Sequence, residues 1–220
     1  IMDCTVTGGN NRIRVPNQVE YLGLVEQECV MRYSMVQEAG GTRSRRGMLA
    51  LDLDGNIVWH RALGEIQNYH GPAGSPLLYN DTVIIYQDQG ASFGAGGINR
   101  ESAGAYVTAL DAATGEPRWR TARSASVGWG TPIAISLGDH DELIVSSSRD
   151  VRSYDPTSGE ELWTCDGNLF EVIPTPVVGL GLVFSSSGRA GPTLAIRPGG
   201  RGNITDTHVE WQTTRGSPFV

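Results

Sequence analysis

The sequence predicts an all-β protein built from repeated four-stranded antiparallel sheets, and two recurring markers support this. One short pattern recurs in degenerate copies, the fullest of which runs from Ala109 to Trp119. The tryptophans that end successive copies lie 60, 44 and 48 residues apart. Ser-Pro or Thr-Pro pairs recur in phase with them, their prolines 56, 44 and 42 residues apart. A period of about 40–50 residues with short strands is typical of solenoids and propellers, whereas a sandwich lacks such self-similarity.

The repeated pattern is expected to form a β-hairpin that ends on an aromatic side chain. Val107 and Ala109 belong to the first strand, and Thr114-Gly115 supplies the turn, in which the glycine adopts the positive φ that a short loop needs. The tryptophan follows at a fixed offset and is expected to wedge between neighbouring sheets. The residues assigned to the repeat are Asp52, Gly55 and Trp59 in the first unit, Asp111, Gly115 and Trp119 in the second, Asp155, Gly159 and Trp163 in the third, and Trp211 in the fourth.

We expect a single partial propeller domain over residues 1–220, divided into blades by these markers. Each blade has strands a to d, counted outward from the propeller axis. Residues 1–46 are interpreted as an eroded or incomplete first blade, with strands at 19–25 and 29–36 and a polar tract at 40–46. The remaining boundaries are 47–64 for the end of the first blade, 73–122, 130–165 and 174–213 for three complete blades, and 217–220 for the start of another.

Turn residues separate the expected strands within each complete blade. In the second unit Asn80-Asp81 makes the first turn, since both residues favour tight hairpins. The expected strands cover 75–79, 82–87, 105–111 and 117–121 in the second unit, 131–136, 142–147, 151–154 and 161–164 in the third, and 175–178, 182–186, 193–196 and 208–213 in the fourth. The fourth unit carries an insertion between its third strand and Trp211.

Composition excludes several classes of function. The 29 glycines and 11 prolines, with only 19% charged residues, favour many short strands joined by turns over helices. The net charge is −7, and no basic cluster exceeds the 43–46 run, so nucleic acid is a poor partner. No apolar run approaches the ~18 residues of a membrane span. Cys4, Cys29 and Cys165 are an odd set, so at most one disulfide can form among them.

The pattern Ala-x-Asp-x-x-Thr-Gly-x-x-x-Trp resembles the tryptophan-docking repeat of the PQQ-like (quinoprotein-type) β-propellers. The second unit matches it in full, the third has Ser153 and Ser158 in place of Ala and Thr, and the first is one residue shorter. The resemblance covers roughly residues 47–220. It implies a partial β-propeller of four-stranded antiparallel blades, because members of that family close seven or eight blades and this chain is too short for a ring. The chain is therefore interpreted as incomplete.

The resemblance leaves two classes of function open, because the family holds both dehydrogenases and scaffold proteins. The leading hypothesis is a non-enzymatic binding or scaffold module of a bacterial protein, periplasmic or extracellular, whose export signal does not lie in this chain. Its expected partners are the remaining blades of the same propeller or another protein, with a polar small molecule as a further candidate. The alternative is a fragment of a PQQ-dependent alcohol or sugar dehydrogenase.

A ligand site, if present, is expected on the face that carries the d–a and b–c connections. Loop topology brings together His70, Trp129, Glu171 and Arg189 there, and places the hairpin turns at Gly115 and Gly159 on the opposite rim. Arg189 offers a two-donor fork, Glu171 accepts hydroxyl hydrogens and Trp129 provides a flat apolar platform, which suits sugars or carboxylates. The competing interpretation is that the aromatic residues only pack between blades and that His70 caps a turn.

No cofactor is expected under the leading hypothesis, and PQQ with calcium enters only under the alternative. Quinone enzymes of the family need calcium held by carboxylate and amide oxygens, and often adjacent cysteines, which this chain lacks. Asp88, Asn168 and Glu171 are the candidate oxygen donors, but no spacing relates them. The four histidines show no ligand spacing, so no metal site is predicted.

Overall fold

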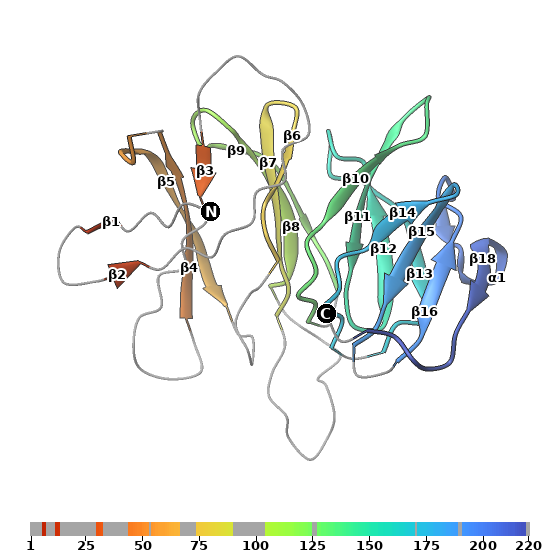
Figure 1. Cartoon of the computed structure of the whole chain (residues 1–220). Coiled ribbons are helices and arrows are strands. Elements are labelled where there is room, and N and C mark those ends of the chain that lie inside the picture. Colours follow the sequence, from red (N-terminus) through yellow and green to blue (C-terminus); the bar gives the residue numbers. More distant parts are fainter. Residues whose placement is uncertain are drawn as a thin grey trace.

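Four β-sheets of three to five strands stand side by side in chain order in the computed structural model (Figure 1). The structure describes residues 6–7, 12–13, 30–32, 44–52, 54–66, 74–89, 104–124, 127–169, 171–188 and 191–218. We call the four sheets blades 1 to 4. They form an open, nearly all-β arc, and the one described helix has only four residues, α1 (Thr205–His208). The predicted fold class, a partial β-propeller, is confirmed.

Blade 1 has three described strands, β3 (Val30–Arg32), β4 (Ser44–Leu51) and β5 (Ile57–Ile66). A separate pair, β1 (Val6–Thr7) with β2 (Arg12–Ile13), precedes it. The sequence analysis placed residues 40–46 in a polar tract before the first hairpin. In the structure, residues 44–46 instead pair with 64–66 and form the start of β4. The strand predicted at 19–25 lies outside the described residues.

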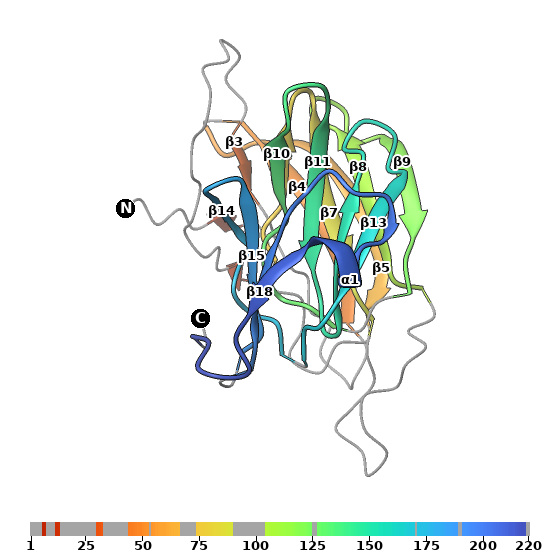
Figure 2. The same cartoon turned by 90° about the vertical axis from the view of Figure 1, so that its right-hand side faces the viewer.

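Blades 2 and 4 are four-stranded antiparallel sheets with strands in chain order, as predicted. Blade 2 contains β6 (Leu77–Tyr79), β7 (Thr82–Gln87), β8 (Tyr106–Asp111) and β9 (Pro117–Ala122). Blade 4 contains β14 (Val177–Gly179), β15 (Leu182–Ser186), β16 (Thr193–Ile196) and β18 (Val209–Gln212). Figure 2 shows the blades from the side of blade 4.

Blade 3 has a fifth strand that comes from blade 4. Its own strands are β10 (Ile133–Ser136), β11 (Asp141–Ser146), β12 (Asp150–Tyr154) and β13 (Glu161–Asp166). The insertion of blade 4 supplies β17 (Gly202–Asn203), which runs parallel to β13. The N–H of Ile204 donates to the carbonyl of Thr164 at 2.9 Å, so the insertion clamps the two blades together.

The tryptophan of every hairpin occupies the same register. The pairs are Ala50 with Trp59, Ala109 with Trp119, Ser153 with Trp163 and Ala195 with Trp211, and a β-bulge follows each pair immediately. A bulge bends the strand and re-aims the side chain beside it. The repeated sequence pattern therefore produces a repeated local geometry in all four blades.

Two of these tryptophans contact the next hairpin in the same way. The indole N–H of Trp59 donates to the carbonyl of Ala112 at 3.0 Å, and that of Trp119 to Pro156 at 3.1 Å. Each accepting residue follows the aspartate of the next blade's turn. A Cβ on Gly115 would lie 2.5 Å from a ring carbon of Trp59, and one on Gly159 would lie 2.4 Å from a ring carbon of Trp119. These turns therefore need glycine for space as well as for positive φ.

Trp163 departs from the expected equivalence. It is fully buried, and its indole N–H donates to the carboxylate of Glu142 in its own blade at 2.9 Å. Blade 4 has Arg197 where the other hairpins have aspartate, and the inserted segment replaces the turn that would receive the ring. The other oxygen of Glu142 accepts the N–H of Gly199 from that insertion at 3.1 Å. At this junction the buried carboxylate of Glu142 therefore replaces the carbonyl of the next hairpin as the acceptor of the indole N–H.

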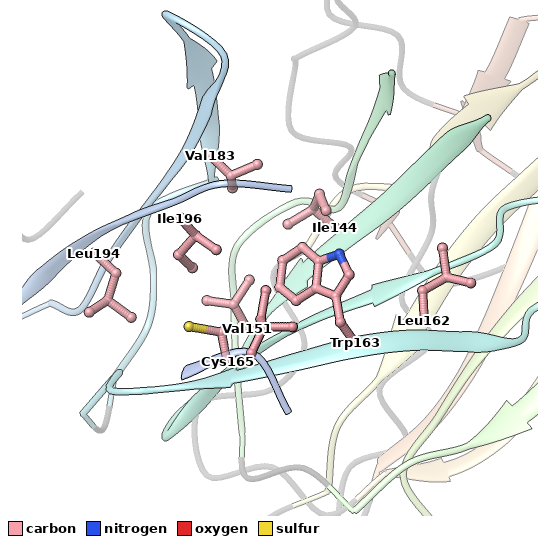
Figure 3. Packing of buried hydrophobic residues seen from close by; sticks show 9 residues of the cluster. Ile144, Val151, Leu162, Trp163, Cys165, Val183, Leu194 and Ile196 are labelled. Carbon is pink, nitrogen blue, oxygen red and sulfur yellow. The ribbon is translucent and has the colours of Figure 1, made fainter. Parts of the chain in front are cut away.

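The hydrophobic core is divided into clusters between blades. Trp163 packs with side chains of blades 3 and 4, including Ile144, Val151 and Val183 (Figure 3). Corresponding clusters join blade 1 to blade 2 around Trp59 and blade 2 to blade 3 around Tyr154. Each blade therefore depends on its neighbours for stability, as in other repeat proteins.

Replacing Gly159 by alanine tests the Trp119 contact against a matched control. Gly159 and Gly181 have the same φ of +76°, but a Cβ on Gly181 meets nothing within 4 Å, whereas one on Gly159 meets Trp119. We expect Gly181→Ala to cost about 1–2 kcal/mol for the left-handed backbone. Gly159→Ala should cost a further 1–3 kcal/mol, roughly, for overpacking. Urea unfolding measures both, and equal losses would contradict the contact.

Candidate functional site on the loop-rich rim

The two edges of the arc differ in their connections. The b–c and d–a connections lie on one edge, which we call the loop-rich rim, and the a–b turns and c–d hairpins lie on the other, the turn rim. Of the four predicted ligand residues, the structure describes Trp129 and Glu171. His70 and Arg189 lie outside the described residues. The hairpin turns at Gly115 and Gly159 lie on the turn rim.

Trp129 and Glu171 lie in neighbouring d–a connections on the loop-rich rim. Gly128 and Val172 form an isolated parallel bridge, and the N–H of Trp129 donates to the carbonyl of Val172 at 2.8 Å. The structure therefore brings these two predicted residues close together, although blade 3 separates them in sequence. Whether they bind a ligand remains a prediction.

The Ser/Thr-Pro markers connect the blades at this rim. The N–H of Ser75 donates to the hydroxyl of Thr131, and the N–H of Thr131 donates to the hydroxyl of Thr175, both at 3.1 Å. The hydroxyls of Thr131 and Thr175 thus each accept a hydrogen bond from the marker of the blade before. The hydroxyl of Ser217 lies 2.6 Å from that of Thr193, in β16 of blade 4. The marker recurs because it fastens one blade to the next.

Glu171 is held inside the rim and does not present its side chain openly. It is 5% exposed and has a φ of +61°, which is uncommon for a residue other than glycine. Its backbone carbonyl accepts the N–H of Gly188 at 2.9 Å. Its backbone therefore ties the d–a connection to the b–c turn of blade 4.

Asn168 anchors the same connection through its amide. It is 4% exposed, and its Nδ2 donates to the carbonyl of Ser147 and the hydroxyl of Ser185, both at 3.1 Å. The N–H of Leu169 donates to the hydroxyl of Ser187 at 2.9 Å. The polar groups of this connection thus bond to serines at the b–c edges of blades 3 and 4, as buried polar groups usually do. These hydrogen bonds hold the backbone of the connection in place at the rim.

Directly beneath the rim, between blades 2 and 3, lies a buried ion pair. The side chains of Asp88 and Arg123 have no exposed surface, and Arg123 Nε lies 3.3 Å from Asp88 Oδ1. Arg123 also donates to the hydroxyl of Ser147 at 2.5 Å. Its guanidinium carbon lies 5.4 Å from the ring centre of Tyr86 and 5.8 Å from that of Tyr154, within the range of cation–π attraction.

A second, partly buried pair adjoins the first. Arg152 donates to Asp150 at 2.8 Å and to Glu161 at 2.9 Å, and its guanidinium also reaches the carbonyl of Ser124 at 2.8 Å. Asp150 is one of the charges that act on Asp88. The two pairs form one electrostatic cluster, which we call the Arg123 cluster (Asp88, Arg123, Asp150 and Arg152).

The pKa of Asp88 is raised to about 6, chiefly because burial penalises its carboxylate. The charge of Arg123 opposes this rise, and that of Asp150 adds to it. The folded protein therefore binds a proton on Asp88 more tightly than the unfolded chain does. Stability from this group is present at low pH and is lost as the pH rises through about 6.

We therefore expect Asp88→Asn to flatten the pH dependence of stability in the window between about 4 and 6. In the wild type this group adds stability as the pH falls from 6 towards 4, and asparagine cannot titrate. Urea unfolding at a series of pH values measures the difference between the two curves. A difference that does not change across this window would contradict the buried position of the carboxylate.

The sequence offered Asp88 only as a candidate oxygen donor for calcium under the dehydrogenase alternative, and its pairing with Arg123 was not foreseen. Asp88 and Arg123 each directly follow a strand and lie at the same rim. This placement was the one sequence signal that could have indicated that they meet. The described residues hold no group of three acidic, histidine or cysteine side chains placed to bind a metal ion. Asp88 pairs with the guanidinium of Arg123, and the amide of Asn168 already bonds to Ser147 and Ser185. These two candidate donors therefore do not suit calcium.

The turn rim carries a shallow polar depression of about 340 Å³ between blades 2 and 3. Its polar groups bond to one another: the Tyr79 hydroxyl donates to Asp141 at 2.7 Å, and His140 Nδ1 lies 2.8 Å from Asp139. These contacts lower the pKa of both aspartates and raise that of His140. The depression is thus an internally bonded surface.

The blade architecture and the repeated hairpins define a PQQ-like β-propeller. The family described as "Outer membrane protein assembly factor BamB" matches residues 103–218, more than half of the chain. The chain belongs to this family. No curated protein matches it in sequence. Within the described residues, no helix is long and apolar enough to cross a bilayer.

Solved structures with the same architecture include BamB from Moraxella catarrhalis, with a TM-score of 0.53 and 18% sequence identity. That comparison covers 92% of this chain and 60% of the BamB chain, so this chain spans less than two thirds of that protein. Quinohemoprotein alcohol dehydrogenase from Comamonas testosteroni has a TM-score of 0.46 and 13% identity, over 79% of this chain and 34% of the enzyme. At these identities the likeness concerns the fold.

Proposed function

We propose that this chain is part of a non-enzymatic scaffold that binds another protein through the loop-rich rim, in the periplasm of a bacterium. The observation that carries the proposal is the inward bonding of the rim's polar groups, which leaves a fixed surface on which the apolar side chain of Leu169 is exposed. Leu169 is 51% exposed at this rim, directly after the anchored Asn168. Rigid loops with exposed apolar groups are typical of protein-binding surfaces.

The family description supports a protein partner and an extracytoplasmic location. It names an assembly factor of outer membrane proteins, and the matched residues 103–218 include Trp129, Leu169 and Glu171. An assembly factor works by contact with other proteins. In this proposal Leu169 is an apolar anchor, Trp129 lies in the neighbouring connection, and Glu171 holds the backbone beneath them.

Photo-crosslinking of the complete protein tests this assignment. A photoreactive amino acid is placed at residue 169 and, as a control, at residue 180, which is 98% exposed on the turn rim. Produced in the periplasm of a Gram-negative bacterium, the 169 variant should form one defined protein adduct, and the 180 variant should not. The adduct should weaken at least tenfold with Trp129→Ala. Equal labelling from both positions would argue against the rim as the binding surface.

The alternative, a piece of a PQQ-dependent dehydrogenase, is tested separately. The complete protein is titrated with the quinone and calcium, and dye-linked oxidation of alcohols and sugars is measured. The scaffold proposal expects neither saturable quinone binding nor oxidation. Tight binding with turnover would replace it with the enzyme.

A further inference from the structure

The buried carboxylate of Glu142 joins three separate parts of the chain where blades 3 and 4 meet. One oxygen accepts the indole N–H of Trp163 in β13 at 2.9 Å, and the other accepts the N–H of Gly199 in the insertion of blade 4 at 3.1 Å. The second oxygen also lies 3.4 Å from Nε2 of His140, in the turn that joins β10 to β11. The side chain of Glu142 has no exposed surface, so these contacts replace the water that it loses.

Both ring nitrogens of His140 face carboxylate oxygens. Nδ1 lies 2.8 Å from Asp139, and Nε2 faces Glu142. An ionised carboxylate only accepts hydrogen bonds, and a neutral imidazole has a single N–H, so only the protonated ring donates to both partners at once. A buried carboxylate is also costly without a cation, and within the described residues the ion pair of Glu142 is with His140. The geometry therefore favours the charged form of this histidine.

The other titratable side chains around this turn come from blades 2 and 3 and from the insertion. They are Asp141, Asp155 and Tyr79, which line the same depression, and Arg201 and His208, which lie beside Gly200 of the insertion. The surroundings of His140 on the two blades are therefore mainly acidic.

These surroundings raise the pKa of His140 above its ordinary value of 6.5, chiefly because Asp139 accepts a hydrogen bond from the ring. Burial opposes the rise, and Glu142 adds to it. A histidine with a raised pKa contributes stability that is fully present below about pH 6.5 and is lost as the pH rises through the raised value. The ring is 30% exposed, so it exchanges protons with solvent.

We propose that His140 is a pH-sensitive latch, whose protonated ring holds the insertion of blade 4 (residues 198–208) against blade 3 and whose deprotonation loosens it. The insertion lies along the outer edge of β13, to which it adds β17 (Figure 2). It also carries Ile204, which is 2% exposed in the core between the blades. Glu142 binds this insertion directly, through Gly199.

Loss of one proton from His140 acts on the Glu142 side of the ring. The shorter contact, to Asp139, keeps the remaining N–H, and the lone pair of Nε2 then faces the carboxylate of Glu142. Glu142 loses its cation and is left with the N–H groups of Trp163 and Gly199. The insertion then opens more often, which uncovers the outer edge of β13.

Hydrogen exchange of the Ile204 amide, measured by NMR in the complete protein between about pH 6 and about pH 9, tests the latch. This amide donates to Thr164 in β13, so it exchanges when the insertion opens. Its rate is divided by that of the Asp111 amide, which donates to Glu116 in the hairpin of blade 2, because the ratio removes the general acceleration of exchange by base. In the wild type the ratio should rise by about fivefold or more across this range.

Three variants assign the rise to His140. His140→Gln keeps a donor for Glu142 but cannot titrate, so its ratio should stay constant within about twofold. His208→Gln removes the histidine of the insertion and should leave the rise as in the wild type. Asp139→Asn removes the carboxylate that most raises the pKa of His140, so the midpoint should move to lower pH by about 0.5 unit or more.

The midpoint of the rise should also coincide with the titration of the His140 ring followed by NMR in the same samples. A ratio that stays flat in the wild type would overturn the proposal. An equal rise in His140→Gln, or a midpoint that Asp139→Asn does not move, would overturn it as well, because the insertion would then respond to another group.

Discussion

Trp163→Ala is expected to lower the free energy of unfolding by about 3–5 kcal/mol, the usual loss for a buried aromatic residue. The Trp163 side chain is fully buried in the cluster that joins blades 3 and 4. Its removal leaves a cavity and deprives the buried Glu142 carboxylate of the indole N–H that it accepts. Urea unfolding followed by circular dichroism measures the loss.

Trp211→Ala is the matched control, because Trp211 occupies the same strand register in the next blade but is 47% exposed. We expect it to cost no more than about 0.5 kcal/mol, as for surface substitutions generally. Similar losses for the two variants would mean that Trp163 does not occupy the inter-blade core.

Arg123→Leu is expected to have an effect of comparable size, about 3–5 kcal/mol, because it leaves the Asp88 carboxylate buried without its partner. The loss should be larger at pH 8 than at pH 5. With the pKa of Asp88 at about 6 even beside Arg123, the carboxyl is largely protonated at pH 5 and then needs no cation. Chemical unfolding at the two pH values measures the loss.

Two further variants separate the buried pair from a general effect of removing arginine. Arg118→Leu removes a guanidinium that is 49% exposed and pairs with Asp81 and Asp111, and its effect on stability should be small beside that of Arg123→Leu. The double variant Asp88→Leu/Arg123→Leu should recover much of the loss, because it leaves no unpaired charge. If it proves less stable than Arg123→Leu, the burial of the Asp88 charge is not the cause.

The fold was predictable because its signals are local. The Asp-x-x-Thr-Gly turn and the tryptophan lie within eleven residues, so the local sequence of each hairpin determines its turn and its strand register. The meeting of Trp129 and Glu171 at one rim also followed from the topology. Trp163 differed because its environment depends on a distant insertion and on Glu142, which no local pattern reveals.

The Arg123 cluster could not be predicted for a similar reason. Asp88 and Arg123 are 35 residues apart in the sequence, in connections that follow different strands. Only the packing of blade 2 against blade 3 buries them together and brings Ser147 and Tyr154 against the guanidinium. Buried charge pairs of this kind are a property of the assembled interface.

The seating of Trp59 and Trp119 on the hairpin of the next blade, which joins blade 1 to blade 2 and blade 2 to blade 3, is tested most directly by hydrogen exchange of the indole N–H groups. Measured by NMR, the indole N–H groups of Trp59 and Trp119 should exchange slowly, and that of Trp211 should exchange quickly. Gly115→Val should release Trp59 and leave Trp119 protected. Rapid exchange at Trp59 and Trp119 in the folded wild type would contradict the claim.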